Sequence, residues 1–302
     1  MNQHAVVVAT DAAFALPTTV ALRSLLEHTE AAPAVVVLES GLSAEQRAAM
    51  ESSLPGRPSV RFVPMDTITI DANIRSHLPD AAYFRLWAVA AVGDGPARVL
   101  YVDSDVLVRE SIDALWEVDL AGHPIAAVRS VNYPWVATRG AVDSWREVEI
   151  EPRSPYFNSG VLLLDPRRWQ EEDISRRCLE YISSPLSGRG ADQEALNAVL
   201  AGRWAELGPE WNQQPSLLDD HHGAHLIYDD DAIARARRAP IVVHFQDRPK
   251  PWHRDCVHPR AQDWREVAAR TAFHPIELER TPLREVVRWR LKRAASALVR
   301  GR

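Results

Sequence analysis

Two aspartates, Asp103 and Asp105, stand two positions apart in the sequence YVDSDVLV, directly after the apolar stretch 98–102. In extended backbone, side chains two positions apart point to one face, so both carboxylates can reach the same cation. Carboxylate oxygens bind hard divalent ions, and an ion held there can neutralise the charge of a departing phosphate group. Surface turns carry the same pair, and the interpretation as an ordinary turn stays open at this point.

His244 and Lys250 are the next candidates, in the sequence VVHFQDRPKPW. A histidine that ends an apolar strand is a metal ligand or, more often, a hydrogen-bonded structural residue. Lys250 is one of two lysines in a chain with 35 basic residues, and a proline flanks it on each side. A compact ammonium in a rigid frame suits phosphate binding, and the alternative is a lysine retained by chance.

The elements that must position these residues alternate between strand and helix. Short β-branched stretches at 5–10, 34–39 and 60–63 predict buried strands, and a capping box at 43–46 predicts the start of the helix before the third strand. This order predicts an α/β fold: a doubly wound, mostly parallel sheet flanked by helices. Such sheets bind ligands beyond the carboxyl ends of their strands, which is where the stretch 98–102 delivers the aspartate pair.

The second half of the chain has a less regular pattern. The segment 123–157 is rich in Pro, Trp and Tyr and has no sustained period, so we expect an insertion or lid that shapes a substrate site. We expect further strands at 161–164 and 241–245, and helices at 171–183, 191–204 and 261–271.

Composition places the chain among ordinary folded proteins. It has 302 residues, of which 46% are hydrophobic and 25% charged, and no apolar stretch approaches the roughly 18 residues that span a bilayer. The start, MNQHAVVVATD, shows no basic leader or cleavage site, so we expect a cytoplasmic protein. Cys178 and Cys256 are too few for a disulfide framework and are expected to be reduced.

The carboxyl-terminal tail is basic, whereas the rest of the chain is acidic. Residues 283–299 place apolar side chains at helical spacing among arginines, which is typical of an amphipathic helix on an anionic membrane surface. The alternative is a terminal helix packed on the domain. The basic patch is short and terminal, which argues against DNA or RNA binding.

Four stretches in this order and spacing resemble one family. They are YVDSDVLVRESIDALWEVDL (101–120), YFNSGVLLLD (156–165), DQEALNAVL (192–200) and HFQDRPKPWHRDC (244–256). Together they resemble the retaining glycosyltransferases that include glycogenin and the bacterial lipopolysaccharide galactosyl- and glucosyltransferases, most of all the lipopolysaccharide galactosyltransferases. The resemblance covers roughly residues 5–270 and extends to the basic tail.

The resemblance implies a GT-A fold over residues 1–271, followed by the amphipathic tail 272–302. The half at about 1–110 would bind a nucleotide sugar, and the half at about 111–271 would face the acceptor. Asp103, Asp105 and His244 would hold Mn²⁺ against the two phosphates of a UDP-sugar. Mg²⁺ fits less well because it prefers oxygen and water to imidazole.

The remaining roles also follow from the resemblance. Thr10 and Asp11 would lie beside uracil and ribose, and Arg85 near the sugar or phosphates. Asn158 would face the donor sugar, Asp192 would bind its hydroxyls, and Gln193 would lie near the anomeric carbon. Donor binding would thus involve Thr10, Asp11, Arg85, Asp103, Ser104, Asn158, Asp192 and Lys250, and catalysis Gln193, Asp192 and Lys250.

Each role has a structural alternative. Arg85 could extend from a helix to solvent, Asn158 could be a turn residue, and Asp192 could cap the helix that follows it. Three departures bear on the donor: Asp247 replaces a usual glycine, Ala12 to Phe14 replace polar residues, and Arg129 replaces a sugar-contacting acid. The donor sugar therefore stays open between glucose and galactose.

The expected activity is transfer of a hexose from a UDP-sugar, with retention, to a glycan, lipid-linked or secondary-metabolite acceptor. Front-face attack is favoured over double displacement, because Gln193 is a neutral amide and a poor nucleophile. The first alternative is a pseudoenzyme that binds nucleotide sugars without turnover. The second, a nucleotidyltransferase, is disfavoured because the stretch VATDAAFALP is neither glycine-rich nor basic. The expected location is the cytoplasm, with contact between the tail and the inner face of the membrane as a further hypothesis.

Overall fold

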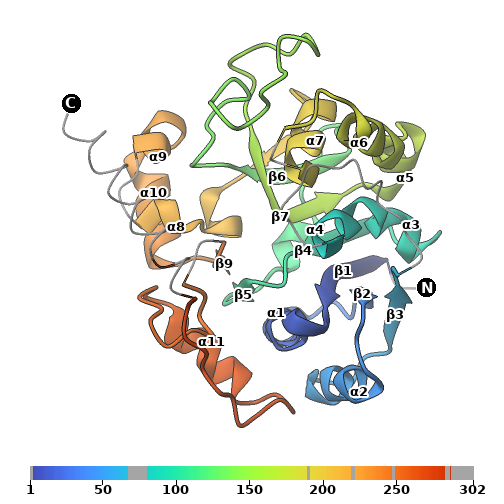
Figure 1. Ribbon diagram of the computed structural model, residues 1–302, viewed down its shortest axis with the longest axis vertical. Helices are drawn as coiled ribbons and strands as arrows, with labels where there is room; N and C mark the ends of the chain where they lie inside the picture. The colour runs from blue at the N-terminus through green and yellow to red at the C-terminus, as the bar shows by residue number, and fades with distance from the viewer. Residues whose placement is uncertain are drawn as a thin grey trace.

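The computed structural model describes residues 3–66, 80–188, 191–218, 222–246, 249–282 and 286. Its centre is a seven-stranded sheet with the strand order β3-β2-β1-β4-β7-β6-β8, and a separate pair is formed by β5 and β9 (Figure 1). The strands are β1 (His4–Asp11), β2 (Ala34–Ser40), β3 (Val60–Pro64), β4 (Arg98–Val102), β5 (Val106–Val108), β6 (Ile125–Arg129), β7 (Phe157–Leu164), β8 (Ala205–Leu207) and β9 (Val242–His244).

Helices cover both faces of the sheet. One face packs against α3, α5, α6 and α7 through side chains such as Val89, Trp169 and Leu196, and the other packs against α1, α2 and α4 through side chains such as Leu22 and Met50. The α-helices are α1 (Ala15–Glu27), α2 (Ala44–Ser53), α3 (Ala88–Val92), α4 (Asp113–Trp116), α5 (Pro166–Glu171), α6 (Ile174–Ser183), α7 (Ala191–Val199), α8 (Pro215–Leu218), α9 (His222–Ile227), α10 (Asp230–Arg238) and α11 (Ala261–Ala268). Three 3₁₀ helices are η1 (Ala12–Phe14), η2 (Asp80–Trp87) and η3 (Pro209–Asn212).

The amino-terminal half follows the predicted pattern. The strands β3, β2, β1 and β4 pair in parallel, and helices α1 and α2 lie between the first three in sequence. The predicted capping box begins α2: Ser43 Oγ accepts from the Gln46 amide at 3.2 Å, and Gln46 Oε1 accepts from the Ser43 amide at 3.0 Å. The predicted doubly wound, mostly parallel α/β sheet is therefore confirmed.

Two changes of strand direction create the place where the candidate residues meet. Strand β7 runs antiparallel to β4, with Val161 opposite Val102, so the start of β7 lies beside the end of β4. Strand β9 runs antiparallel to β5, with His244 opposite Val106. The end of β4, the start of β7 and the end of β9 thus come together at one edge of the sheet.

The segment 123–157 is only in part the insertion that its sequence predicts. Residues Ile125–Arg129 form β6, which lies inside the sheet between β7 and β8, so the expectation of an insertion over the whole segment is wrong. All five residues of β6 are buried and alanines supply two of them, so the strand shows neither alternation nor a strong apolar signal. The remainder, 130–156, forms the long loop between β6 and β7 at the top of Figure 1.

The first part of the tail packs on the domain. Residues 276–281 run beside the loop that follows Lys250: the Arg254 amide donates to Glu279 O at 2.8 Å, and the Glu279 amide donates to Trp252 O at 3.1 Å. Thr281 is buried there. The predicted amphipathic helix at 283–299 lies, apart from residue 286, outside the described residues. Among the helices that the structure describes, none combines the length and apolar character that crossing a bilayer requires.

Candidate active site

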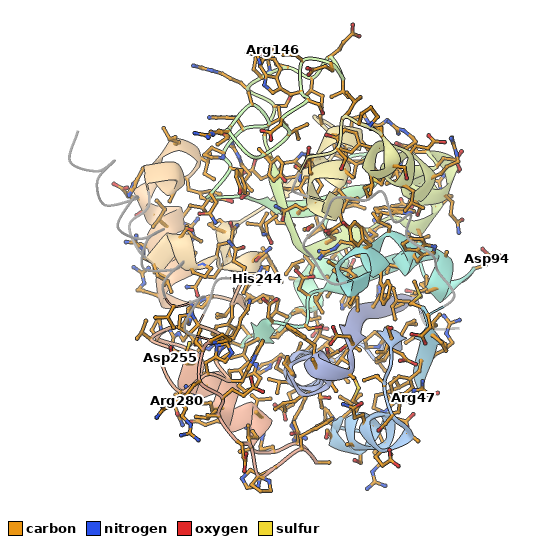
Figure 2. All side chains as sticks on the ribbon, viewed as in Figure 1. Arg47, Asp94, Arg146, His244, Asp255 and Arg280 are labelled. Atoms are coloured by element: carbon orange, nitrogen blue, oxygen red, sulfur yellow. The ribbon has the colours of Figure 1, made fainter. Side chains whose placement is uncertain are left out.

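The aspartate pair and the histidine meet as their sequence patterns predict. Asp103 follows β4, Asp105 precedes β5, and His244 ends β9. One ligand atom from each lies within 4.8 Å of the other two, and His244 Nε2 is 3.3 Å from Asp105 Oδ1 and 3.7 Å from Asp103 Oδ2. His244 lies near the centre of the molecule in Figure 2, whereas the labelled Asp94, Arg146 and Arg280 lie at its margin.

Close packing against β7 shapes this cluster. A Cβ atom added to Gly160 would lie 2.2 Å from His244 Cε1 and 2.9 Å from Asp103 Oδ2, closer than real Cβ contacts allow. The Gly160 carbonyl also accepts from the Asp103 amide at 2.8 Å. Gly160 is therefore required for the imidazole and the carboxylate to come this close to the sheet.

Two buried cations neutralise the two carboxylates. Lys250 Nζ donates to Asp105 Oδ2 at 2.5 Å and to the carbonyl of Phe245. Arg85, on η2, lies 3.1 Å from Asp103 Oδ1 through Nη2 and 2.6 Å from Asp192 Oδ2 through Nε. Lys250 is only 7% exposed and Arg85 only 8%, so neither extends to bulk solvent. The alternative for Arg85, a side chain reaching out to water, is excluded.

The pKa directions follow from burial and these pairs. Burial favours the neutral form of Asp105, but Lys250 and His244 outweigh it and hold the pKa of this carboxyl well below its usual range. Burial raises the pKa of Asp192 to about 6, with Arg85 opposing the rise. Burial also raises the pKa of Tyr101 well above its usual range, and the Tyr101 hydroxyl donates to Asp103 Oδ1 at 3.0 Å.

A cavity of about 330 Å³ opens beside the cluster. Seven of the predicted site residues line it: Thr10, Asp11, Arg85, Asp103, Ser104, Asp105 and Lys250. Among the described residues, Ala9, Phe14, Ala81, Ala82, Tyr101 and Gln246 also line it. Its position beyond the carboxyl ends of β1 and β4 is where a doubly wound sheet binds its ligand.

A larger cavity of about 530 Å³ lies at the opposite edge of the sheet. It is lined mainly by proline, alanine and valine, near the amino ends of β1 and β2. No candidate metal ligand or buried ion pair of the described residues faces it. Its size therefore does not make it the stronger candidate.

Residues at the end of β1 also line the smaller cavity. Thr10 is buried and its hydroxyl lies 2.8 Å from that of Thr18, which also lies 2.8 Å from Ser104 Oγ. Asp11 caps η1, because its Oδ1 accepts from the amides of Ala13 and Phe14. One oxygen of Asp11 is thus committed to the backbone, and the carboxylate as a whole still borders the cavity.

Asn158, Asp192 and Gln193 form a layer behind the cavity wall. Asn158 Nδ2 donates to Gln193 Oε1 at 3.2 Å and to Gln246 Oε1 at 3.0 Å. Asp192 lies in the first turn of α7, and its carboxylate pairs with Arg85. Neither Asn158 nor Asp192 is merely a turn or cap residue, because each side chain contacts another candidate residue.

Sequence reasoning missed several residues of this arrangement. Tyr101 and Gln246 line the cavity, and Asn212 Oδ1 lies 2.9 Å from His244 Nδ1. Gln246 stands two positions after the predicted histidine, which is a signal that could have been used. Asn212 stands in the sequence EWNQQP and carries no periodic signal.

Two of the noted departures have different outcomes. Asp247 lies outside the described residues. Arg129 is buried, its Nη2 donates to Pro134 O at 3.1 Å, and its guanidinium lies 4.6 Å from the centre of the Trp135 ring. Burial lowers its pKa. Arg129 therefore holds the start of the long loop and is not part of the cavity wall.

The donor set at the cluster fits a divalent cation. It offers two carboxylates and one imidazole nitrogen, and Nε2 of His244 faces both carboxylates while Nδ1 is occupied by Asn212. A ligating histidine commonly has its second nitrogen hydrogen-bonded in this way. A set of oxygens with one imidazole suits Mn²⁺ and similar ions of intermediate hardness.

Comparison with known proteins identifies the family to which this fold and this site belong. Residues 5–256 match the family model described as glycosyl transferase family 8. General stress protein A of Bacillus subtilis (strain 168) is 27% identical over 251 residues, which cover 80% of this chain and 83% of that protein. The lipopolysaccharide 1,3-galactosyltransferase of Salmonella typhimurium is 27% identical over 190 residues, and the match spans 52% of its length.

A solved structure extends the likeness to three dimensions. The galactosyltransferase LgtC, in complex with donor and acceptor sugar analogs, matches with a TM-score of 0.71 and 28% sequence identity, over 88% of this chain and 95% of that one. The predicted GT-A fold is confirmed by this likeness. Because the family model matches residues 5–256, which are most of this chain, the chain belongs to glycosyltransferase family 8.

Proposed function

We propose that this protein is a retaining hexosyltransferase that uses UDP-glucose or UDP-galactose and depends on Mn²⁺, with Mg²⁺ a poorer substitute. The acceptor is a glycan, a lipid-linked saccharide or a secondary metabolite. Family membership supports the transferase activity. The observation that supports a nucleotide-sugar donor is the cluster of Asp103, Asp105 and His244. Both aspartates line a cavity that the buried cations Arg85 and Lys250 also line.

Asp103, Asp105 and His244 would hold the ion, which when bound supplies positive charge against the diphosphate of the donor. Lys250 adds a buried ammonium at the same wall, and a cation in a water-poor site stabilises developing negative charge more strongly than one in solvent. Arg85 joins Asp103 to Asp192 and so fixes the two carboxylates relative to each other.

The part of the cavity wall near the end of β1 suits the uridine part of the donor. Thr10, Asp11 and Ser104 line it, together with the ring of Phe14, whose edge meets Trp252 with ring centres 5.7 Å apart. These residues support our proposal that the half of about residues 1–110 binds the nucleotide sugar, and we assign the acceptor side to about 111–271. The long loop 130–156 and the layer of Asn158, Asp192 and Gln193 belong to that side.

Front-face attack is the mechanism that these contacts favour. In double displacement a group of the protein would have to attack the anomeric carbon, and Gln193 is the residue that the family resemblance puts nearest to it. Its carbonyl oxygen already accepts from the Ser159 amide at 3.0 Å and from Asn158 Nδ2 at 3.2 Å. A neutral amide oxygen with two hydrogen bonds is a weak nucleophile.

The test is release of free UDP from a panel of UDP-sugars, measured with Mn²⁺, with Mg²⁺ and with EDTA. We expect release from one UDP-hexose with Mn²⁺, little in EDTA, and little from Asp105→Ala. Asp165→Ala is the matched control, because it removes an aspartate that also follows a buried strand but lies outside the cavity wall.

Three outcomes would contradict the proposal in different ways. Equal release of UDP in EDTA and in Mn²⁺ would contradict the proposed dependence on a metal ion. Donor binding by calorimetry, without hydrolysis or transfer to any acceptor tested, would favour the pseudoenzyme. Formation of UDP-glucose from UTP and glucose 1-phosphate would favour the nucleotidyltransferase.

For the location, we propose the cytoplasm, with the tail in contact with the inner face of the membrane. Binding to anionic vesicles that survives deletion of residues 283–302 would contradict the role of the tail.

A further inference from the structure

A chain of buried amide groups connects the backbone of β7 to His244. The Gly160 amide donates to Asn158 Oδ1 at 3.0 Å, and Asn212 Nδ2 donates to the same oxygen at 2.8 Å. Asn212 Oδ1 in turn lies 2.9 Å from His244 Nδ1. Asn212 is 0% exposed and His244 is 2% exposed, so water cannot replace a partner in this chain without rearrangement.

The backbone amide decides the orientation of every group that follows it. A backbone N–H can only donate, so the atom of Asn158 that faces Gly160 must be the carbonyl oxygen. The atom of Asn212 that faces the same oxygen must then be its NH₂ group. Asn212 therefore turns its own carbonyl oxygen toward His244, and an oxygen that only accepts requires a proton on His244 Nδ1.

The consequence appears at the other nitrogen of the ring. In a neutral imidazole only one nitrogen carries a proton, so Nε2 keeps its lone pair. Nε2 is the atom that faces Asp105 at 3.3 Å and Asp103 at 3.7 Å. The chain thus leaves His244 with the lone pair on the side where a metal ion would bind.

The same chain has a second branch. Both hydrogens of Asn158 Nδ2 point to glutamine oxygens, those of Gln193 and Gln246. The Ser159 amide also donates to Gln193 Oε1, and Gln193 Nε2 donates to the Tyr156 hydroxyl at 3.4 Å, so both ends of this amide are fixed. Asn158 therefore uses its full hydrogen-bonding capacity on protein groups.

We propose that Asn212 is a positioning residue that holds His244 in the Nδ1-protonated tautomer. We also propose that Asn158, whose orientation is fixed by the Gly160 amide, fixes the orientation of the Gln193 amide. The part that concerns a metal rests on the proposed function; the tautomer and the orientation of Gln193 do not. Sequence position gives no hint of this role, since Asn212 and Asn158 are 54 residues apart. The two amides act as one unit because they share a single acceptor oxygen.

The tautomer can be measured without metal or substrate. Two-bond ¹H–¹⁵N spectra of the EDTA-treated protein, labelled in histidine, distinguish the two neutral tautomers, and His244→Gln identifies the signal. At a pH at which the ring is neutral, we expect the pattern of a proton on Nδ1. A proton on Nε2 with none on Nδ1 would overturn the proposal. This result does not depend on activity, so it separates failure of the inference from failure of the proposed function.

Two substitutions at Asn212 separate the branches. Asn212→Asp keeps an oxygen for His244 Nδ1 but places a second oxygen against Asn158 Oδ1, so Asn158 must turn and Gln193 loses the hydrogen bond from Asn158. We expect Mn²⁺ affinity within a few-fold of the parent, and a fall of about tenfold in kcat with little change in KM for the donor. Asn212→Leu removes the acceptor, and we expect Mn²⁺ affinity to fall by about 10- to 100-fold.

Calorimetry with Mn²⁺ alone and a thermal melt accompany both variants. Equal loss of Mn²⁺ affinity in the two variants would overturn the assignment, because a merely structural asparagine would not distinguish them. Unchanged Mn²⁺ affinity in a folded Asn212→Leu would overturn it as well. If Asn212→Leu does not fold, Asn212→Asp is the test: nearly unchanged Mn²⁺ affinity with a lower kcat supports the proposal, and any other combination contradicts it.

Discussion

Asp103 and Asp165 stand in nearly the same sequence context and do different work. Each directly follows a buried apolar strand, β4 in one case and β7 in the other. Asp103 ends at the cluster with Asp105 and His244, whereas Asp165 Oδ1 accepts from the Arg168 amide at 3.0 Å and caps α5. The two strands are adjacent and antiparallel, so their ends lie at opposite edges of the sheet.

The difference shows that strand direction, and not the local pattern, decides what an aspartate after a strand can do. At the edge of Asp103 the carboxyl ends of parallel strands meet, and strand β9 and the loop after it bring His244 and Lys250 to the same place. At the edge of Asp165 the carboxylate pairs with Arg98, which is half-buried and lies 3.8 Å away. The predictions below test how far this contrast extends to function and stability.

The largest effect is expected at Asp103. Asp103→Asn keeps the size of the side chain but removes a charged ligand and the partner of Arg85. We expect a loss of about 10³-fold in kcat/KM for donor hydrolysis, which corresponds to about 4 kcal/mol. Steady-state kinetics at saturating Mn²⁺ measure it. A variant with more than half of the parent activity would show that Asp103 is no more functional than Asp165.

Asp192 offers a carboxylate that is buried on a helix and titrates at higher pH. Its pKa of about 6 lies above the unfolded value of about 3.9, so the folded state binds more protons in between. The stability that this group contributes is complete below pH about 4 and is lost as the pH rises through about 6. The free energy of unfolding of the parent, minus that of Asp192→Asn, should therefore fall by about 2 kcal/mol from pH 4 to pH 7.

Urea unfolding of both proteins in EDTA, at several pH values, measures this difference. All other groups titrate in both proteins, so the comparison isolates Asp192. A difference that stays constant with pH would show that Arg85 compensates the burial of Asp192 completely.

Lys250 is the cation that most clearly separates the two edges. It lies 2.5 Å from Asp105, against 3.8 Å for Arg98 and Asp165. Lys250→Met keeps the apolar stem and removes the charge, and we expect a fall of about 100-fold in kcat/KM, or about 2.7 kcal/mol. Arg98→Gln is the control and should leave kinetics unchanged. Equal effects in the two variants would contradict a special role for the lysine.

The smallest effect is expected at Asp165 itself. Asp165→Ala removes the cap of α5 and should lower the free energy of unfolding by about 1 kcal/mol. The pair with Arg98 adds little because both side chains are partly exposed. Donor hydrolysis should equal that of the parent when both are folded. A fall in activity beyond the loss of folded protein would mean that the opposite edge is coupled to the site.

Much of the fold could be predicted because its signals are local. The alternation that leads from β1 to β3 and the capping box of α2 depend on neighbouring residues, and both are confirmed. The strand β6 could not be predicted, because its burial between β7 and β8 is a consequence of tertiary pairing. The helix expected at 171–183 is instead α5 and α6, since Asp165 and Pro166 start a helix earlier.

The candidate site was predictable where charge stands at strand ends. The strands place Asp103, Asp105 and His244 at one edge of the sheet. The other site residues were predicted from the family resemblance. The antiparallel start of β7 beside the end of β4 is not visible in sequence, and it is what brings Asn158 and Gly160 to the cluster. Asn212 was missed because a buried amide looks like any polar loop residue.

The close approach at Gly160 offers a way to obtain an inactive reference enzyme without altering any charge. Gly160→Ala would keep both carboxylates, the imidazole, the lysine and the backbone groups of the amide chain, but its methyl group would clash with His244 Cε1 at 2.2 Å and displace the ring. Such a protein would keep the same number of charged groups as the parent. Acceptor binding and membrane association could then be studied with a chain whose catalytic geometry is blocked by one methyl group.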